Sequence, residues 1–331
     1  MLRKCWLICF GVLLIGCQQK EKNVIYEKVT YQLLNDSVMT RMPGDLIVAD
    51  GYLVWEDPFA RDYFVNVHDR VTGREIGKMG KVGEGPAEFI TGGINSFCIN
   101  KKFFATDLNG KTRGFLSLDS LLDRKDCFVP LTDKEKSERP DMKELQNNVF
   151  VGISEDGNTD YFNAIINSQK ITFGAYPVKE VREHVGNDLA YDSISGLLAC
   201  CSFRIPYLAL YKRDGYTFNM QWELEPDGGY EVSDGRLILD DRVGGILDIA
   251  LGKDYIICLQ RDWKREPLDK SVSGRDVRAL PHTVFLYDYD SRLLKVVDLG
   301  MPVVRIAADR RSNTLYAFGL NPEYILVKYE L

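Results

Sequence analysis

Four polar segments of the sequence each carry an arginine, and Phe59 and Trp263 add an aromatic ring to two of them. A guanidinium group binds a carboxylate or a phosphate through two parallel hydrogen bonds. A neighbouring ring offers an apolar face on which a ligand can stack. If the fold brings the segments together, they predict a site for a small anionic ligand such as an acidic sugar or a peptide. The candidate ligand-binding residues are Arg61, Arg113, Arg204 and Arg261, with Phe59 and Trp263 beside them.

The same arginines have a second interpretation, because acidic residues lie close to them in the sequence. Exposed ion pairs between arginine and aspartate are common and contribute about 1 kcal/mol or less. An arginine that is already paired in this way is not available to a ligand. Both interpretations stay open at the level of sequence. The aspartates concerned are Asp57, Asp62, Asp107 and Asp262.

The sequence offers little support for catalysis. It has three histidines, too few for a site built from several histidine ligands, and it contains no nucleophile elbow. Asp50, Asp107, Glu155 and Asp248 could supply oxygen ligands to calcium, but no spacing singles them out. We therefore predict a non-catalytic binding or interaction protein without a cofactor. A calcium-dependent enzyme is the alternative.

The residue with the most specific chemistry is Cys17, which follows Leu14-Ile15-Gly16 at the end of a short apolar run. Arg3 and Lys4 give this segment a basic start, and small residues stand where a signal peptide is cleaved. The run is much shorter than the roughly 20 apolar residues of a membrane-spanning helix. Cleavage before Cys17 would leave the cysteine as the new N-terminus.

This segment resembles the signals of bacterial lipoproteins. The resemblance implies that residues 1–16 are a signal peptide and that Cys17 carries a diacylglyceryl thioether and an acylated amine. Two or more acyl chains anchor a protein stably. We therefore expect a lipid-anchored protein of the cell envelope, held at the outer membrane, with residues 17–23 as a polar tether. The periplasmic face and the cell surface both remain open as locations.

The charge of the chain excludes one class of partner, and its cysteine content indicates the state of the thiols. The chain has 42 basic and 48 acidic residues and no basic block, so we do not expect it to bind nucleic acid. Besides Cys17, five cysteines follow the signal segment: Cys98, Cys127, Cys200, Cys201 and Cys258. Because most lie in apolar stretches, we expect unpaired structural thiols, with a disulfide between Cys200 and Cys201 as the minor alternative.

The elements that must position these residues repeat along the chain. A pair of apolar strands around a tight polar turn occurs six times, and its second strand recurs about every 50 residues. Such a period is typical of propeller blades with four strands each. The return strands begin at Tyr52, Phe103, Val149, Leu197, Tyr255 and Leu315.

We therefore predict an all-β fold, a six-bladed β-propeller of four-stranded antiparallel blades formed as a single domain by residues 24–331. The last repeat ends one strand short, and a lone strand-like segment at 24–34 can complete it and close the ring. Two β-sandwich domains are the rival arrangement, but no linker or change of composition divides the sequence.

The segment Gly80-Lys81-Val82-Gly83-Glu84-Gly85-Pro86-Ala87-Glu88-Phe89 resembles the G-x-G-x-G-P-x-E-F segment of six-bladed, TolB-like propeller lipoproteins of gut-type Gram-negative bacteria. With the lipoprotein signal that ends at Cys17, called a lipobox, and with the repeat, the resemblance covers nearly the whole chain after the signal. It implies the propeller fold and an envelope location, without a defined activity. Under the enzyme alternative, the protein would be similar to the calcium-dependent lactonases or lyases built on such propellers. Within the segment, we expect Phe89 to dock between blades.

Overall fold

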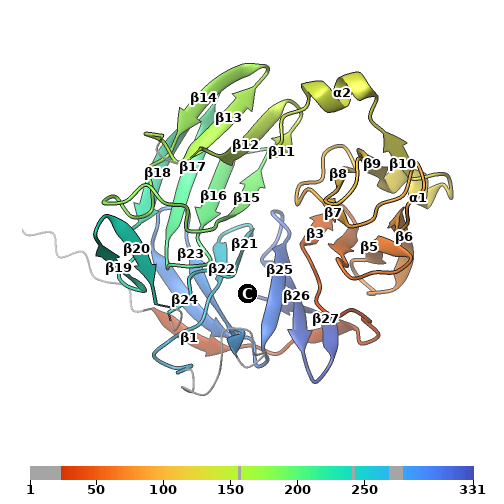
Figure 1. The fold of residues 1–331 in the computed structure, drawn as a ribbon. Coiled ribbons are helices and arrows are strands. Elements are labelled where there is room, and N and C mark those ends of the chain that lie inside the picture. Colours follow the sequence, from red (N-terminus) through yellow and green to blue (C-terminus); the bar gives the residue numbers. More distant parts are fainter. Residues whose placement is uncertain (1–23, 156–157, 241–242, 268–278) are drawn as a thin grey trace, which may run out of the picture.

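The computed structural model describes residues 24–155, 158–240, 243–267 and 279–331. The predicted signal segment 1–16 and the predicted tether 17–23, including Cys17, lie outside the described residues. The described chain is almost entirely β-structure and forms a six-bladed propeller (Figure 1). Each blade is built on four antiparallel strands, as the sequence predicted.

The first three blades follow one another along the chain, and each begins with its innermost strand. They are β3 (Leu46–Ala49), β4 (Tyr52–Glu56), β5 (Tyr63–Asp69) and β6 (Glu75–Lys81); β7 (Gly92–Ile94), β8 (Lys102–Asp107), β9 (Arg113–Ser117) and β10 (Phe128–Pro130); and β11 (Lys143–Gln146), β12 (Val149–Ile153), β13 (Phe162–Ile166) and β14 (Gln169–Phe173).

The remaining three blades continue the same order from inside to outside. They contain β15 (Asp188–Asp192), β16 (Leu197–Cys201), β17 (Leu208–Asp214) and β18 (Thr217–Leu224); β21 (Asp248–Leu251), β22 (Ile256–Leu259), β23 (Thr283–Tyr287) and β24 (Leu293–Asp298); and β25 (Val303–Ala308), β26 (Thr314–Leu320) and β27 (Tyr324–Glu330).

The inner hairpins form where the sequence predicted them, because their residues suit both the turns and the burial. Asp50 has a φ of 53°, and Asn100 and Lys101 have φ values of 50° and 57°. Left-handed residues at a two-residue turn give the twist that a tight hairpin needs. All residues of β21 and β22 are buried, as expected for strands covered on both faces by neighbouring blades.

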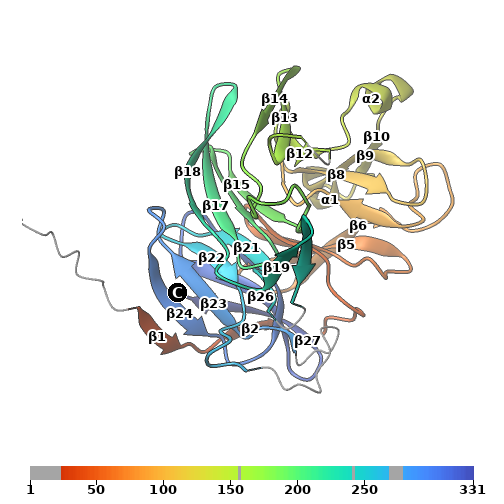
Figure 2. The same ribbon diagram turned by 60° about the vertical axis from the view of Figure 1, so that its left-hand side comes forward.

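The N-terminal segment differs from the single strand predicted at 24–34. It forms two short strands, β1 (Ile25–Lys28) and β2 (Gln32–Asn35), which join two different blades. β2 pairs with β27 and is the fourth strand of the sixth sheet. β1 runs parallel to β24 and adds a fifth strand to the fifth blade, at its outer edge (Figure 2). The ion pairs Glu27–Lys295 and Lys28–Asp298 accompany this parallel pairing.

Three further elements have no counterpart in the predicted repeat. They are α1 (Leu118–Leu122), α2 (Asp133–Glu138) and a hairpin of β19 (Tyr230–Ser233) and β20 (Arg236–Leu239). α2 begins at a capping box between Thr132 and Glu135 and stops before Pro140. The helix lies between the last strand of the second blade and the first strand of the third.

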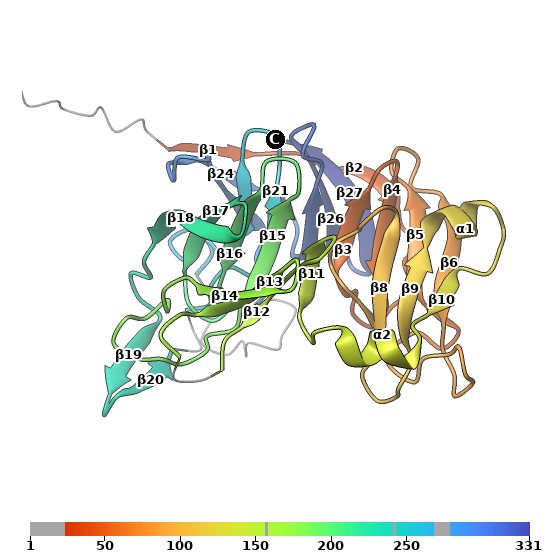
Figure 3. The same ribbon diagram turned by 90° about the horizontal axis from the view of Figure 1, so that it is seen from above.

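The propeller has two distinct faces. The loop face is the end at which the innermost strands begin, and it carries the β4–β5, β8–β9, β16–β17 and β22–β23 connections. The hairpin face is the opposite end, at which the inner hairpins turn. Figure 3 shows α2, β19 and β20 at the loop face, whereas the start of β1 and the C-terminus lie towards the hairpin face.

Clusters of buried apolar residues join neighbouring blades. They lie between the first and second blades around Phe89, the third and fourth around Phe162, the fourth and fifth around Leu208, the fifth and sixth around Val297, and the sixth and first around Trp55. Among the described residues, no such cluster joins the second blade to the third.

The glycine-rich segment at 80–89 connects the first two blades. The Phe89 ring is fully buried and packs edge-on against Phe64 of the first blade and Phe128 of the second. This contact confirms that Phe89 docks between blades. Gly80 has a φ of 70°, and a Cβ there would lie 2.3 Å from the Phe64 ring, so this position requires glycine.

All five cysteines that the structure describes are unpaired. Cys200, Cys201 and Cys258 are buried in the blades, and burial raises the pKa of each thiol well above its usual range. The unpaired thiols agree with the predicted structural role. Within the described part of the chain, no helix has the length and apolar character needed to cross a membrane.

Candidate functional site

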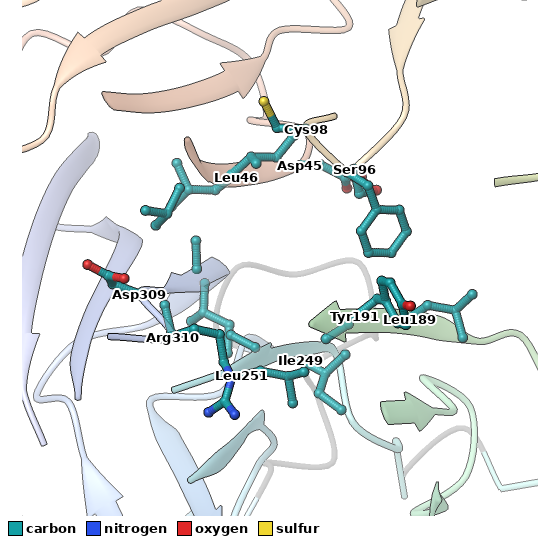
Figure 4. Close-up of a pocket in the computed structure, with 18 of the residues that line it drawn as sticks. Asp45, Leu46, Ser96, Cys98, Leu189, Tyr191, Ile249, Leu251, Asp309 and Arg310 are labelled. Carbon is teal, nitrogen blue, oxygen red and sulfur yellow. The ribbon is translucent and has the colours of Figure 1, made fainter. Parts of the chain in front are cut away.

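The central channel is a cavity of about 440 Å³ lined by the inner strands (Figure 4). Apolar side chains such as Leu46, Leu189 and Ile249 form much of its wall. Asp309 and Arg310 lie towards its hairpin-face end, where Arg310 contacts Asp192 at 3.1 Å and also donates to the Tyr289 hydroxyl at 2.7 Å. Arg310 therefore ties the sixth blade to the fourth and fifth.

Four carboxylates surround the loop-face end of the channel, and we call Asp45, Glu56, Asp188 and Asp248 the mouth carboxylates. Each is engaged by a neighbouring blade. Ser96 donates to Asp45, the Ile94 amide donates to Glu56 at 2.9 Å, Lys143 lies 3.6 Å from Asp188, and the Ile306 amide donates to Asp248 at 2.7 Å. Because each contact crosses a blade boundary, the mouth carboxylates hold the ring together.

Burial makes two of these carboxylates weak acids. Burial raises the pKa of Glu56 to about 7, and the negative charge of Asp45 adds to this effect. The pKa of Asp248 is raised well above its usual range by complete burial and then by the charge of Asp188. The Arg305 guanidinium, 3.9 Å from Asp45, and the Lys143 ammonium group offset part of the repulsion. The mouth is therefore less negatively charged than four carboxylates suggest.

Glu56 predicts a pH dependence of stability. Its pKa is about 7 in the folded protein and 4.5 in the unfolded chain, so the folded state binds this proton more tightly. The resulting stabilisation is fully present below pH 4.5 and is lost as the pH rises to 7. We expect Glu56→Gln to match the wild type near pH 4.5 and to exceed its stability above pH 7, by up to about 3 kcal/mol. Urea unfolding of both proteins at acidic and alkaline pH measures this difference, and parallel pH profiles would contradict it.

The residues considered as calcium ligands do not form one group. Asp50 and Asp248 both line the channel, whereas Asp107 lies in the β8–β9 loop, where it accepts backbone amides from Ile90 and Thr91. Glu155 is exposed in the β12–β13 connection. Over residues 24–155, 158–240, 243–267 and 279–331, no cluster of three or more His, Cys, Asp or Glu side chains is arranged to hold a metal ion.

A second cavity combines two of the predicted binding residues. It has a volume of about 1070 Å³ and lies at the loop face of the first blade, between the β4–β5 connection and residues 36–41. We call it the first-blade pocket. The Phe59 ring in its wall is 50% exposed, and Arg61 stands beside it. In the part of the chain that the structure describes, no carboxylate lies within ion-pair distance of Arg61.

The first-blade pocket has a mixed lining. Lys81 is paired with Glu88 at 2.6 Å, and Asp57 accepts hydrogen bonds from the Thr40 hydroxyl and the Phe59 amide. Arg41 and Arg61 remain as the unpaired cations of the described lining. The other charged residues around the pocket are Asp36, Asp62, Lys78 and Glu323.

The structure separates the other predicted binding residues. Arg113 lines a different cavity, between the second and third blades, and Arg204 is exposed in the β16–β17 loop. Arg261 is buried, donates to the carbonyl oxygens of Glu266 and Leu280, and lies 3.7 Å from the Glu266 carboxylate. Its guanidinium is 5.6 Å from the Trp263 ring. Thus Phe59 and Arg61 share one cavity, whereas Arg113 lines another.

The aspartates near these arginines in the sequence do not pair with them in the described part of the loops either. Asp57 and Asp107 accept backbone amides of their own loops, and Asp262 pairs with Arg265 at 2.8 Å. Short acidic side chains in tight loops commonly bond to the backbone a few residues on. Arg261 instead lies 3.7 Å from the carboxylate of Glu266, which is farther along the sequence than Asp262.

No known protein family and no curated protein matches the sequence. Solved structures match the fold. A member of the DUF4221 family from Bacteroides vulgatus has a TM-score of 0.56 at 12% identity, over 92% of this chain and 96% of its own. A "Putative exported protein" from Bacteroides fragilis has a TM-score of 0.54 at 10% identity, over 92% of this chain and 98% of its own.

A third similar structure is regucalcin from Agrobacterium tumefaciens, described as a calcium-binding protein. Its TM-score is 0.50 at 9% identity, over 92% of this chain and 95% of its own. At identities this low, the three similarities establish the propeller fold and nothing about activity. The TolB-like resemblance and the lipobox remain predictions.

Proposed function

We propose that this protein is a lipid-anchored, non-catalytic binding propeller of the cell envelope that recognises an acidic sugar or peptide in the first-blade pocket. The observation that carries the proposal is the half-exposed Phe59 ring beside Arg61 in the largest of the three cavities described above. The ring supplies a stacking surface, and the unpaired guanidinium supplies a partner for one acidic group.

The mixed charge of the pocket defines the ligand more closely. Asp36, Asp62 and Glu323 also line it, so a densely charged polyanion would meet repulsion. A ligand with one acidic group near Arg61 and neutral groups elsewhere fits the lining. Acidic oligosaccharides with alternating acidic and neutral sugars have this character, as do peptides with a single carboxylate.

Binding of a hyaluronan tetrasaccharide, compared with the neutral tetramer of N-acetylglucosamine, tests the proposal. We expect the full-length protein in detergent to prefer the acidic oligosaccharide. Arg61→Ala should weaken binding by about 1.5 to 3 kcal/mol, the usual scale for a hydrogen bond to a charged group, without lowering the melting temperature. Arg204→Ala, at an exposed loop position, is the matched control. Equal binding by wild type and Arg61→Ala would refute this site.

Anchoring through Cys17 is tested separately. Because the acyl chains attach to the Cys17 sulfur, Cys17→Ala should abolish labelling by an alkyne fatty acid and release or mislocalise the protein. Its melting temperature should stay unchanged, since the blades begin downstream of this position. A Cys17→Ala protein that is still labelled and membrane-bound would remove the anchor from the proposal. Protease shaving of intact cells then distinguishes the periplasmic face from the cell surface.

A calcium-dependent enzyme remains the alternative function. Similarity to regucalcin, described as calcium-binding, shows the fold alone. The mouth carboxylates are engaged across blade boundaries, and this geometry favours a structural role. Titration of the protein with Ca²⁺ and with EDTA, followed by melting temperature and by hydrolysis of a test lactone, decides between the two functions.

A further inference from the structure

The boundary between the second and third blades, which we call the seam, differs in chemistry from the other blade boundaries. Five apolar clusters join the other neighbouring pairs, and the described residues form none here. The Arg139 guanidinium fills part of the seam, 3.7 Å from the centre of the Phe104 ring and 5.1 Å from that of Phe150. Arg139 also pairs with the buried Glu144. The seam therefore combines a buried ion pair with aromatic side chains and is incompletely filled.

Beside Arg139, the seam contains a cavity of about 430 Å³ that opens at the loop face. This volume lies within the range of small-molecule sites. Ile94, Phe104 and Val151 form an apolar part of its wall. The polar part consists of Asn95, Thr106 and Arg113 of the second blade, Asp141 and Lys143 at the start of the third, and Asn187, which directly precedes the fourth. A ligand in this seam pocket would contact both blades.

Two cations in the seam pocket come from opposite sides. Arg113 begins β9 of the second blade and Lys143 begins β11 of the third. Within the described residues, Arg113 has no ion pair, and the ion pair of Lys143 is a 3.6 Å contact with Asp188. The carboxylate of the lining, Asp141, is exposed. The pocket can thus place a guanidinium and an ammonium group around one anionic group.

The side chain of Asn95 indicates a second chemical group that a ligand of the seam pocket needs. Its amide nitrogen donates to the Glu144 carbonyl at 2.6 Å, and its amide oxygen is buried without a hydrogen-bond partner. A buried acceptor left unpaired costs about 1 to 3 kcal/mol. The oxygen has almost no exposed surface, so a ligand hydroxyl can donate to it only when the Asn95 side chain turns towards the cavity. The two cations call for a carboxylate, and Asn95 turned in this way would accept a hydrogen bond from a hydroxyl group.

We propose that the seam pocket binds a small hydroxy acid of the size of a uronic acid, with its carboxylate between Arg113 and Lys143. Such a ligand joins β9 to β11 at the blade boundary that has no apolar cluster. Its binding therefore stabilises the closed ring as well as the site. This pocket is distinct from the first-blade pocket and takes a smaller ligand.

Galacturonate is the probe and galactose its neutral control, tested by calorimetry and thermal unfolding on the full-length protein in detergent. We expect galacturonate to bind and to raise the melting temperature, and galactose to do neither. Arg113→Gln and Lys143→Gln should each weaken galacturonate binding about tenfold or more, because each removes a charge-assisted hydrogen bond. Arg204→Gln should bind as the wild type does. Asn187→Asp, which adds a carboxylate to the pocket without removing either cation, should also weaken binding.

Several outcomes would overturn the proposal. These are the absence of galacturonate binding, equal shifts with galactose, or binding that survives both Arg113→Gln and Asn187→Asp in folded protein. Loss of galacturonate binding in Arg61→Ala, with Arg113→Gln unaffected, would assign the ligand to the first-blade pocket instead. Conversely, failure of the hyaluronan experiment leaves the seam pocket untouched, because the two sites share no lining residue.

Discussion

Deleting residues 24–35 while keeping the segment that contains Cys17 is expected to abolish stable folding of the propeller. The deletion removes β2, which pairs with β27, and so leaves Leu326 and Val327 in a strand with an open edge. An exposed apolar edge promotes aggregation, and the loss is large for a domain that is stable by about 5 to 15 kcal/mol. We expect aggregation, or a melting temperature lower by about 10 °C or more. Size-exclusion chromatography and thermal unfolding measure both effects.

A shorter deletion is the control. Removing residues 24–30 deletes β1 and leaves β2 in place. Because β1 is a fifth strand on a blade that already has four, this variant should fold and melt close to the wild type. Wild-type stability after the longer deletion would show that the N-terminal segment does not close the ring. Equal destabilisation by both deletions would mean that the loss of β1, and not of β2, destabilises the propeller.

Arg139→Ala should be the most destabilising single substitution at the seam. The Arg139 and Glu144 side chains are only 12% and 9% exposed, so the substitution leaves a buried carboxylate without its cation. It also empties the space among Phe104, Phe115 and Phe150. Breaking a buried ion pair from one side typically costs about 3 to 5 kcal/mol. Urea unfolding of the purified protein measures the loss.

Two further variants test the cause of this effect. Lys134→Ala, on the exposed surface of α2, should change stability by less than about 0.5 kcal/mol. The double variant Arg139→Met with Glu144→Gln should recover much of the lost stability, because it removes the unpaired charge while filling the aromatic space. A loss below about 1 kcal/mol for Arg139→Ala would mean that water replaces the guanidinium without penalty.

The inner hairpins were predictable because their signals are local. Asp50-Gly51 and Asn100-Lys101 mark turns in which Asp50, Asn100 and Lys101 adopt left-handed conformations, and the flanking apolar strands recur at the period of a blade. α2 also had a readable signal, the capping box from Thr132 to Glu135 followed by Pro140. It was missed because the repeat contains no helix.

The roles of the individual arginines could not be predicted from local sequence signals. Arg61 and Arg261 look alike in the sequence, each in a polar loop beside an aspartate and an aromatic residue. In the fold, the β22–β23 connection buries Arg261 against Glu266, whereas the β4–β5 connection leaves Arg61 exposed in a pocket. Arg139 lies in no predicted site, because its partners Phe104 and Phe150 come from strands that meet only in the folded ring. Burial decides between these roles, and burial depends on distant segments.

The direction of β1 has a consequence for how the molecule would sit at a membrane. β1 begins at Ile25, eight residues after Cys17, and runs parallel to β24 from the hairpin-face side of the molecule towards the loop face (Figure 3). A fully extended stretch of that length spans at most about 28 Å. If Cys17 is lipidated, the bilayer surface therefore lies within that distance of the start of β1, on the side of the inner turns. The first-blade pocket and the seam pocket both open on the opposite side, so the tether would present both openings to the aqueous phase rather than to the lipid headgroups.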